Sequence, residues 1–204
     1  MLILDAAAVG ALLPMDECID IMRNALVALA RNDAVTPLRT VIRMSNGALA
    51  AMPAYDGTTE TVGLKIVTVF PNNPAVGLPS HLGVVLLFRA TDGVVSAILD
   101  AAAITAIRTA AVSALATRVL ATEGADVLAI IGTGVQAETH IAAMLAVRPL
   151  RLIRVFGRDP GRTSAFISRL SRRHDCELVA AESAEHAVRG AHIVCTVTGS
   201  RTPV

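Results

Sequence analysis

The sequence has few aromatic residues and no excess of either charge. Only 2% of its 204 residues are aromatic, whereas 53% are hydrophobic, so its core has to be built from aliphatic side chains. Eighteen basic and 17 acidic residues leave a formal net charge of +1. Proteins that bind nucleic acids usually carry a basic excess, so this balance argues against a nucleic-acid partner.

The sequence shows no cysteine framework, and we expect no signal peptide at its start. An odd number of widely spaced cysteines is present: Cys18, Cys176 and Cys195. They match no metal-ligand pattern, and we expect reduced packing residues in a cytoplasmic protein. The first ten residues lack the basic region of a signal peptide and include Asp5. Asp100 and Arg108 interrupt the longest alanine-rich apolar segment, which argues against a membrane span.

A strand, a glycine turn and a helix are predicted in succession within residues 126–147. The apolar run 127–131 is typical of a buried strand, and Gly132-Thr133-Gly134 follows it. Gly132 permits a tight turn, Gly134 lets the backbone approach a pyrophosphate, and Ala137 is the small residue required for close packing. This order favours a dinucleotide site over a glycine turn in an unrelated α/β unit.

The rest of the chain divides into two patterns. Up to residue 122, two helices are followed by β-rich runs that Asn46-Gly47, Asp56-Gly57 and Asp92-Gly93 separate, which predicts hairpins in an antiparallel or mixed sheet. A helix over 101–121 follows. From residue 123 strands and helices alternate, which predicts a Rossmann-type parallel sheet. The fold class is therefore α/β, with a sheet that we expect to be truncated after its fourth strand.

Three cations lie where an ordinary core would avoid them. Lys65 interrupts an apolar strand, Arg108 lies in the middle of the alanine-rich helix, and Arg39 follows Pro37 at the start of a strand. Each has a structural explanation: an extended lysine stem, a solvated helix stripe or an exposed strand end. Together they favour a pocket for an anion such as an α-carboxylate, which a guanidinium binds with two parallel hydrogen bonds.

Several short motifs resemble those of the ornithine cyclodeaminase/mu-crystallin family. They occur in the family's order over essentially the whole chain: PLR at 37–39, MPAY at 52–55, GLK at 63–65, GLPSHLGVVLLF at 77–88, RTAAVSALAT at 108–117 and GTGVQAETH at 132–140. The resemblance implies a substrate-binding and dimerisation domain of α+β type over residues 1–122. It also implies an NAD(P)-binding Rossmann domain over residues 123–204, and hence a homodimer.

The resemblance further assigns substrate residues. It implies that Arg39, Lys65 and Arg108 hold a substrate carboxylate. Lys65 is in addition the candidate catalytic residue that polarises a carbonyl or imine or transfers a proton, because burial beside two arginines should lower its pKa. Ser80 matches a position near the nicotinamide, whereas the adjacent His81 has an equally simple explanation as a loop-packing residue.

Cofactor residues are implied in the same way. Thr109 matches a contact to a cofactor phosphate, and the pyrophosphate loop corresponds to Gly132, Thr133, Gly134, Val135 and Gln136. Arg158 stands near the place where NAD enzymes carry an acidic residue for the ribose diol, about twenty residues after the glycine motif. An arginine there favours a 2′-phosphate, so NADP(H) is preferred and NAD(H) remains possible. Asp159 is expected to cap the next helix, and Arg162 either adds charge to the pocket or lies on the helix surface.

The sequence departs from the family in two respects. Cyclodeaminases that act on ornithine carry an acidic residue just before Met-Pro, where Ala50 and Ala51 stand here. The family's catalytic aspartate corresponds to a position beyond Val204. We therefore expect an NAD(P)H-dependent reductase of a cyclic imino acid or ketimine, such as Δ1-pyrroline-2-carboxylate. The alternatives are an alanine dehydrogenase-like enzyme, an ornithine or lysine cyclodeaminase, and a non-catalytic NADP-dependent ligand-binding protein like mu-crystallin.

Overall fold

The computed structural model describes residues 1–200 and 202–204, which form two compact units, Met1–Ile107 and Arg108–Val204. Helix α3 (Ala101–Leu120) runs through the division between them. The domain boundary expected between residues 122 and 123 stays a prediction. Each unit is described below by itself.

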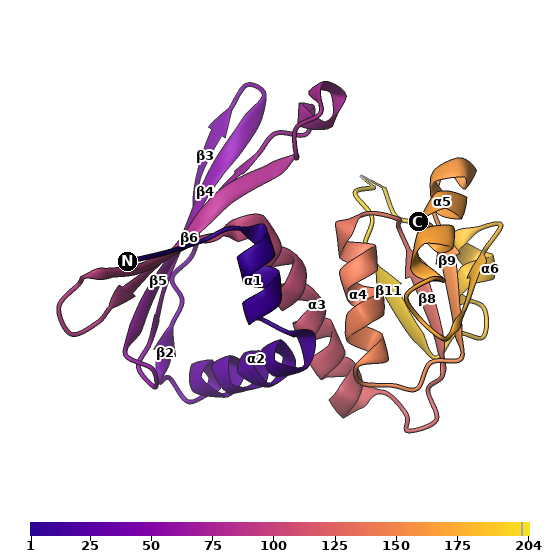
Figure 1. The fold of residues 1–204 in the computed structure, drawn as a ribbon, viewed down its shortest axis with the longest axis horizontal. Helices are drawn as coiled ribbons and strands as arrows, with labels where there is room; N and C mark the ends of the chain where they lie inside the picture. The colour runs from indigo at the N-terminus through magenta and orange to yellow at the C-terminus, as the bar shows by residue number, and fades with distance from the viewer. Residues whose placement is uncertain (201) are drawn as a thin grey trace. The chain divides into compact units, whose positions relative to one another are not determined.

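A seven-stranded mixed sheet forms the first unit (Figure 1). Its order is β1-β7-β6-β5-β4-β2, with β3 paired to β4, and among the described strands of this sheet only β1 and β7 pair in parallel. The predicted hairpins are thereby confirmed. The strands are β1 (Leu2–Leu4), β2 (Ala34–Val35), β3 (Thr40–Met44), β4 (Gly47–Asp56), β5 (Thr61–Val69), β6 (His81–Arg89) and β7 (Val95–Asp100).

Two helices and one long loop complete this unit. Helix α1 (Ala6–Leu12) begins where the Asp5 carboxylate accepts a hydrogen bond from the Ala8 amide, and α2 (Met15–Ala30) begins after Pro14. The loop between β5 and β6 contains the short 3-10 helix η1 (Asn73–Val76). Phe70 N donates to Ser80 O at 2.8 Å across the base of this loop, so its two ends are held together.

The second unit is a four-stranded parallel sheet in the order β10-β9-β8-β11. In chain order this is 3-2-1-4, the order of the first four strands of a Rossmann fold, and the predicted parallel Rossmann-type sheet is confirmed. Strands and helices alternate in this unit, as predicted. They are β8 (Val127–Ile131), α4 (Val135–Leu145), β9 (Leu152–Phe156), α5 (Pro160–Leu170), β10 (Glu177–Ala180), α6 (Ala184–Val188) and β11 (Ile193–Thr196).

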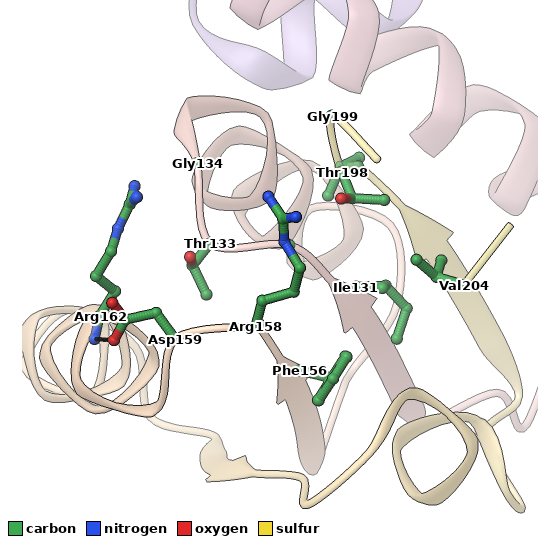
Figure 2. Close-up of a pocket in the computed structure, with 13 residues that line it drawn as sticks. Ile131, Thr133, Gly134, Phe156, Arg158, Asp159, Arg162, Thr198, Gly199 and Val204 are labelled. Atoms are coloured by element: carbon green, nitrogen blue, oxygen red, sulfur yellow. Dashed lines mark hydrogen bonds between the residues drawn. The ribbon is translucent and has the colours of Figure 1, made fainter. Parts of the chain in front are cut away.

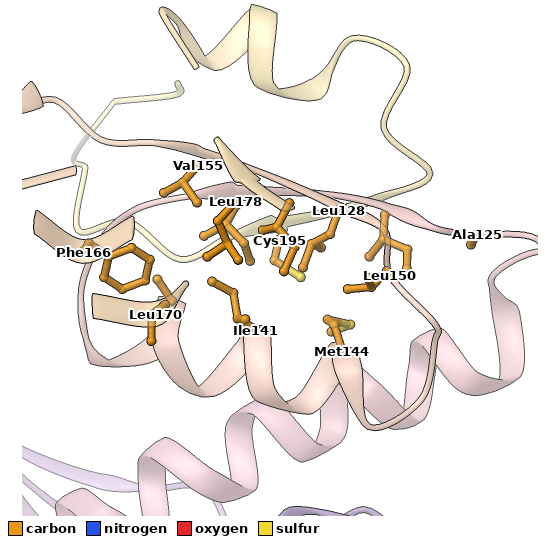
Figure 3. Packing of buried hydrophobic residues seen from close by; sticks show 14 residues of the cluster. Ala125, Leu128, Ile141, Met144, Leu150, Val155, Phe166, Leu170, Leu178 and Cys195 are labelled. Atoms are coloured by element: carbon orange, nitrogen blue, oxygen red, sulfur yellow. The ribbon is translucent and has the colours of Figure 1, made fainter. Parts of the chain in front are cut away.

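Aliphatic side chains fill the core of this unit, and Phe166 is the one aromatic residue in the main cluster of buried side chains. Leu128 from β8, Val155 from β9 and Ile141 and Met144 from α4 all belong to this cluster (Figure 3). Burial of each such side chain stabilises the fold by about 1.5–3 kcal/mol. All five residues of β8 are buried, so this strand, which carries the glycine turn, is held on both faces.

Helix α3 is built largely from small residues. Its start is capped by Asp100, whose Oδ1 accepts a hydrogen bond from Ala103 N at 2.7 Å. Ala110, Ala111 and Ala114 are completely buried, so neighbouring elements approach this helix closely. By length and composition α3 is the one described helix apolar enough to cross a membrane, and it is also consistent with a core helix of a soluble protein.

Candidate functional site

The glycine turn after β8 requires glycine at its first position. Gly132 has a φ of +127°, and a Cβ built there would lie 2.6 Å from the carbonyl oxygen of Val197. A larger residue would therefore strain the backbone and clash with the chain that leaves β11. Gly134, the N-cap of α4, has an ordinary φ of −93°, and a Cβ there would meet no described heavy atom within 4 Å apart from its chain neighbours. The space above the helix N-terminus is thus open.

A cavity of about 250 Å³ lies at this turn (Figure 2). Its walls come from the carboxyl ends of three adjacent parallel strands, which is where open α/β sheets bind their ligands. The amide groups of the first turn of α4 have no partners within the helix, so they and the helix dipole favour a negative group here. The lining residues are Ile131, Gly132, Thr133, Gly134, Phe156, Gly157, Arg158, Asp159, Arg162, Val197, Thr198, Gly199 and Val204.

Close packing holds the end of β9 against the glycine turn. A Cβ at Gly157 would lie 2.8 Å from Thr133 Cγ2 and 2.7 Å from Thr163 Oγ1, so a glycine is needed where β9 leaves the sheet. Thr163 is buried and its hydroxyl donates to Asp159 O at 2.9 Å. These contacts fix the two walls of the cavity relative to each other, yet the sequence motifs did not identify Thr163.

Charged residues line the outer wall of the cavity. Asp159 Oδ1 accepts from Arg162 N at 2.9 Å and so caps α5, which confirms its predicted structural role. Arg158 extends from the end of β9 into the cavity (Figure 2). Arg158 and Arg162 are both exposed, so the cavity has two cations at its rim. The positive rim and the open helix N-terminus fit a phosphate-bearing ligand such as a dinucleotide.

Thr109 and His140 carry polar atoms inside the second unit. Thr109 Oγ1 is buried and has no hydrogen-bond partner among residues 1–200 and 202–204. His140 is buried; its Nδ1 lies 2.7 Å from Gln136 O and its Nε2 lies 3.0 Å from Ser113 Oγ. Burial lowers the pKa of this imidazole, which therefore stays neutral and ties α3 to α4. No role was predicted for His140, although its spacing of four from Gln136 places both residues on one helix face.

In the first unit, Lys65 lies in the middle of β5, paired with Met52 of β4 and Val85 of β6. The side chain is half-buried, and Nζ donates to Thr105 Oγ1 of α3 at 2.5 Å. Thr105 was not identified from the sequence. A signal was present, because Thr105 precedes Arg108 by one helical turn.

The other predicted substrate residues are exposed. Arg39 lies in the segment that leads into β3, and Arg108 lies on α3. Convergence of Arg39, Lys65 and Arg108 on one carboxylate stays a prediction. Ser80 is half-buried at the end of the long loop, with Oγ 2.9 Å from Nδ1 of the exposed His81. This contact gives His81 a structural role within the loop.

Comparison with known proteins gives one consistent family. The model of the ornithine cyclodeaminase/mu-crystallin family matches residues 1–204. Δ1-Pyrroline-2-carboxylate reductase of Bacillus cereus is 33% identical over 206 residues, which cover 100% of this chain and 63% of the relative. Ketimine reductase mu-crystallin of Mus musculus is 35% identical over 170 residues, which cover 82% of this chain and 53% of the relative.

Solved structures agree. Δ1-Pyrroline-2-carboxylate reductase of Thermococcus litoralis, in complex with NADH and L-proline, matches with a TM-score of 0.96 and 34% identity, covering 100% of this chain and 64% of that one. An archaeal alanine dehydrogenase dimer with bound NAD matches with a TM-score of 0.93 and 29% identity, covering 100% of this chain and 62% of that one. The chain thus spans less than two thirds of the length of these relatives.

Proposed function

Because the chain belongs to the ornithine cyclodeaminase/mu-crystallin family, we propose that it forms the substrate-binding and cofactor-binding parts of an NAD(P)H-dependent reductase of cyclic imino acids or ketimines. The observation that carries this proposal is the cavity at the glycine turn, which fits a dinucleotide. The likeness to a reductase structure with NADH and L-proline supports the substrate class.

The residues of the turn hold the pyrophosphate in this proposal. Gly132 and Gly134 let the backbone approach it, and the start of α4 at Val135 and Gln136 presents amide groups and the positive end of the helix dipole. Thr133 and Thr109 add hydroxyl groups, and Ser80 contacts the nicotinamide. When bound, the nicotinamide supplies the hydride for the imine carbon.

The preferred cofactor is NADP(H). Arg158 enters the cavity at the end of the second strand, where a 2′-phosphate is expected, and supplies a guanidinium partner for it. The adjacent carboxylate of Asp159 caps α5, so it has a structural role that is independent of a ribose diol. The solved relatives bind NADH or NAD, so NAD(H) is the alternative.

Arg39, Lys65 and Arg108 bind the substrate carboxylate in this proposal. Lys65 also polarises the imine or moves a proton at its nitrogen. Ala50 supports an imino acid without a distal amine. In the register of β4 and β5, Met52 pairs with Lys65, so Ala50 lies two residues away on the same face of the sheet. No carboxylate stands at that position to receive a distal ammonium group.

Oxidative deamination of a small amino acid is the second candidate, because the archaeal alanine dehydrogenase has the same fold at 29% identity.

We further propose that the protein is cytoplasmic, and that it is a homodimer formed through the first unit. All five residues of β3 are exposed, including the apolar Val41, Ile42 and Met44. Such an apolar strand is typical of a surface that another subunit covers.

A turnover assay on the complete protein tests the function. With Δ1-pyrroline-2-carboxylate we expect oxidation of NADPH, and replacement of Lys65 by Met should lower kcat more than it changes KM. Replacement of Arg108 by Ala should instead raise KM strongly, since a charge-assisted pair typically contributes a few kcal/mol. Binding of NADPH without turnover of any imino or amino acid would show a ligand-binding protein. Wild-type turnover in the Lys65→Met variant would contradict the role of Lys65.

A further inference from the structure

Lys65 is the only lysine in the 204-residue sequence, in which every other basic residue besides histidine is arginine. A compact ammonium group that can lose its proton therefore occurs at one side-chain position only. It stands in the centre of the sheet, where β4 and β6 flank β5 on both sides. Its backbone is thus held on two sides, and the position of the ammonium group depends on what the long side chain contacts.

Thr105 makes one such contact. Lys65 Nζ donates to Thr105 Oγ1 at 2.5 Å, and Thr105 Oγ1 donates to Ala101 O at 2.5 Å. A hydroxyl has one proton, and here it points to the carbonyl of the preceding helical turn. The oxygen therefore faces Lys65 with its lone pairs and acts as an acceptor. A charged donor makes the stronger hydrogen bond to such an acceptor, so the arrangement favours the ammonium form.

The anchor at Thr105 is rigid. A threonine in a helix adopts one of two χ1 rotamers, and the hydrogen bond to Ala101 O favours one of them. Ala101 is completely buried, and Asp100 caps the same helical turn through Ala103 N. The residues that pair with Lys65 in the sheet, Met52 and Val85, are uncharged. The charged residues nearest to Thr105 in the sequence are Asp100, at the end of β7, and Arg108 of α3.

We propose that Thr105 is the positioning residue of Lys65: its hydroxyl directs the Lys65 amine to one place and holds it as an ammonium donor. The hydrogen bond opposes the effect of burial, which by itself would favour the neutral amine. What Lys65 then does to a substrate rests on the proposed function, but its orientation and protonation do not.

The pH dependence of Lys65 acetylation tests whether Thr105 favours the ammonium form of Lys65. The wild-type protein and its variants are treated with trace acetic anhydride from pH 7 to pH 11, and the peptide that carries Lys65 is quantified by mass spectrometry with the N-terminal peptide as reference. Replacement of Thr105 by Val keeps the shape of the side chain and removes the hydroxyl. We expect the acetylation midpoint of Lys65 to fall by about one pH unit, because its ammonium form loses a hydrogen bond.

Two variants serve as controls. Thr105→Ser restores a hydroxyl and should return the midpoint to that of the wild type. Thr117→Val removes an equivalent hydroxyl from the same helix, where Thr117 Oγ1 donates to Ser113 O at 2.9 Å, and should leave Lys65 unchanged. An unchanged midpoint in a folded Thr105→Val variant, or an equal shift in Thr117→Val, would overturn the proposal.

Kinetics separate this proposal from the proposed function. With an imino acid substrate, Thr105→Val should lower kcat with little change in KM for the cofactor, and Thr105→Ser should recover most of kcat. If the acetylation midpoint shifts as expected but the wild-type protein turns over no substrate, the positioning role stands and the proposed function is wrong. If turnover is present and the midpoint and kcat of Thr105→Val equal those of the wild type, the positioning role is wrong.

Discussion

Two neighbouring residues at the end of β9 have opposite charges and different surroundings. The Asp159 carboxylate caps α5, whereas Arg158 extends into the cavity at the glycine turn. Helix capping stabilises a helix by about 1 kcal/mol, so the aspartate has a structural use that does not depend on a ligand. Arg158 does not cap α5, so a substitution at this position tests cofactor choice without removing the helix cap.

We expect Arg158→Asp to reverse the cofactor preference. The substitution removes the partner of a 2′-phosphate and adds an acceptor for a ribose diol, so the affinity for NADPH should fall by about 10–100-fold while that for NADH rises. Fluorescence titration with each cofactor measures the two dissociation constants. Arg162→Ala on the same rim is the matched control and should have the smaller effect. A constant ratio of the two affinities in Arg158→Asp would exclude Arg158 as the residue that contacts the phosphate.

The three cysteine side chains differ in their burial. All are free, and burial raises the pKa of Cys195 to about 11, while Cys176 is only half-buried. The thiolate is the reactive form of cysteine, and at pH 8 only about one in a thousand Cys195 side chains is deprotonated. We expect iodoacetamide to modify Cys176 first in the folded protein, and the rate at Cys195 to rise with pH up to about 11. Equal rates at both cysteines at pH 8 would contradict the burial of Cys195.

In the connection between β8 and α4, one glycine is required by the fold and the other leaves space for a ligand. Gly132 needs its positive φ and its close approach to Val197, whereas a Cβ at Gly134 would enter open space. Gly132→Ala should therefore lower Tm, with a cost of about 1–3 kcal/mol from backbone strain alone. Gly134→Ala should leave Tm nearly unchanged but weaken cofactor binding, because its methyl group occupies the space that a pyrophosphate would use.

Calorimetry of both glycine variants, with and without NADPH, distinguishes these effects. The ligand should raise Tm in the wild type and much less in Gly134→Ala. An equal rise of Tm in the wild type and in Gly134→Ala would mean that no phosphate group approaches Gly134.

At the scale of the whole molecule, the proposed homodimer depends on the exposed apolar strand β3. We expect the complete protein to sediment as a dimer at micromolar concentration. Ile42→Glu should shift it to a monomer, because a buried unpaired carboxylate is costly at an interface. Val94→Glu, at an equally exposed position of the same unit, is the control and should remain dimeric. A monomeric wild-type protein would contradict the proposal.

Local patterns in the sequence determined most of the fold and the cofactor part of the site. The buried strand β8, the glycine turn and the cap at Asp159 all depend on residues close together in the chain, so their spacing was sufficient to predict them. The Asn-Gly and Asp-Gly pairs predicted the hairpins for the same reason. Family resemblance, rather than spacing, supplied the roles of Arg39, Lys65 and Arg108.

Tertiary structure alone decided the contacts between residues distant in sequence. The parallel pairing of β1 with β7 joins residues more than ninety positions apart, and no local pattern specifies it. Lys65 donates a hydrogen bond to Thr105, 40 residues away, and the buried His140 contacts Ser113, 27 residues away. The residues next to a threonine or serine in an alanine-rich helix do not indicate its hydrogen-bond partner, because that partner depends on how the helix packs against the rest of its unit.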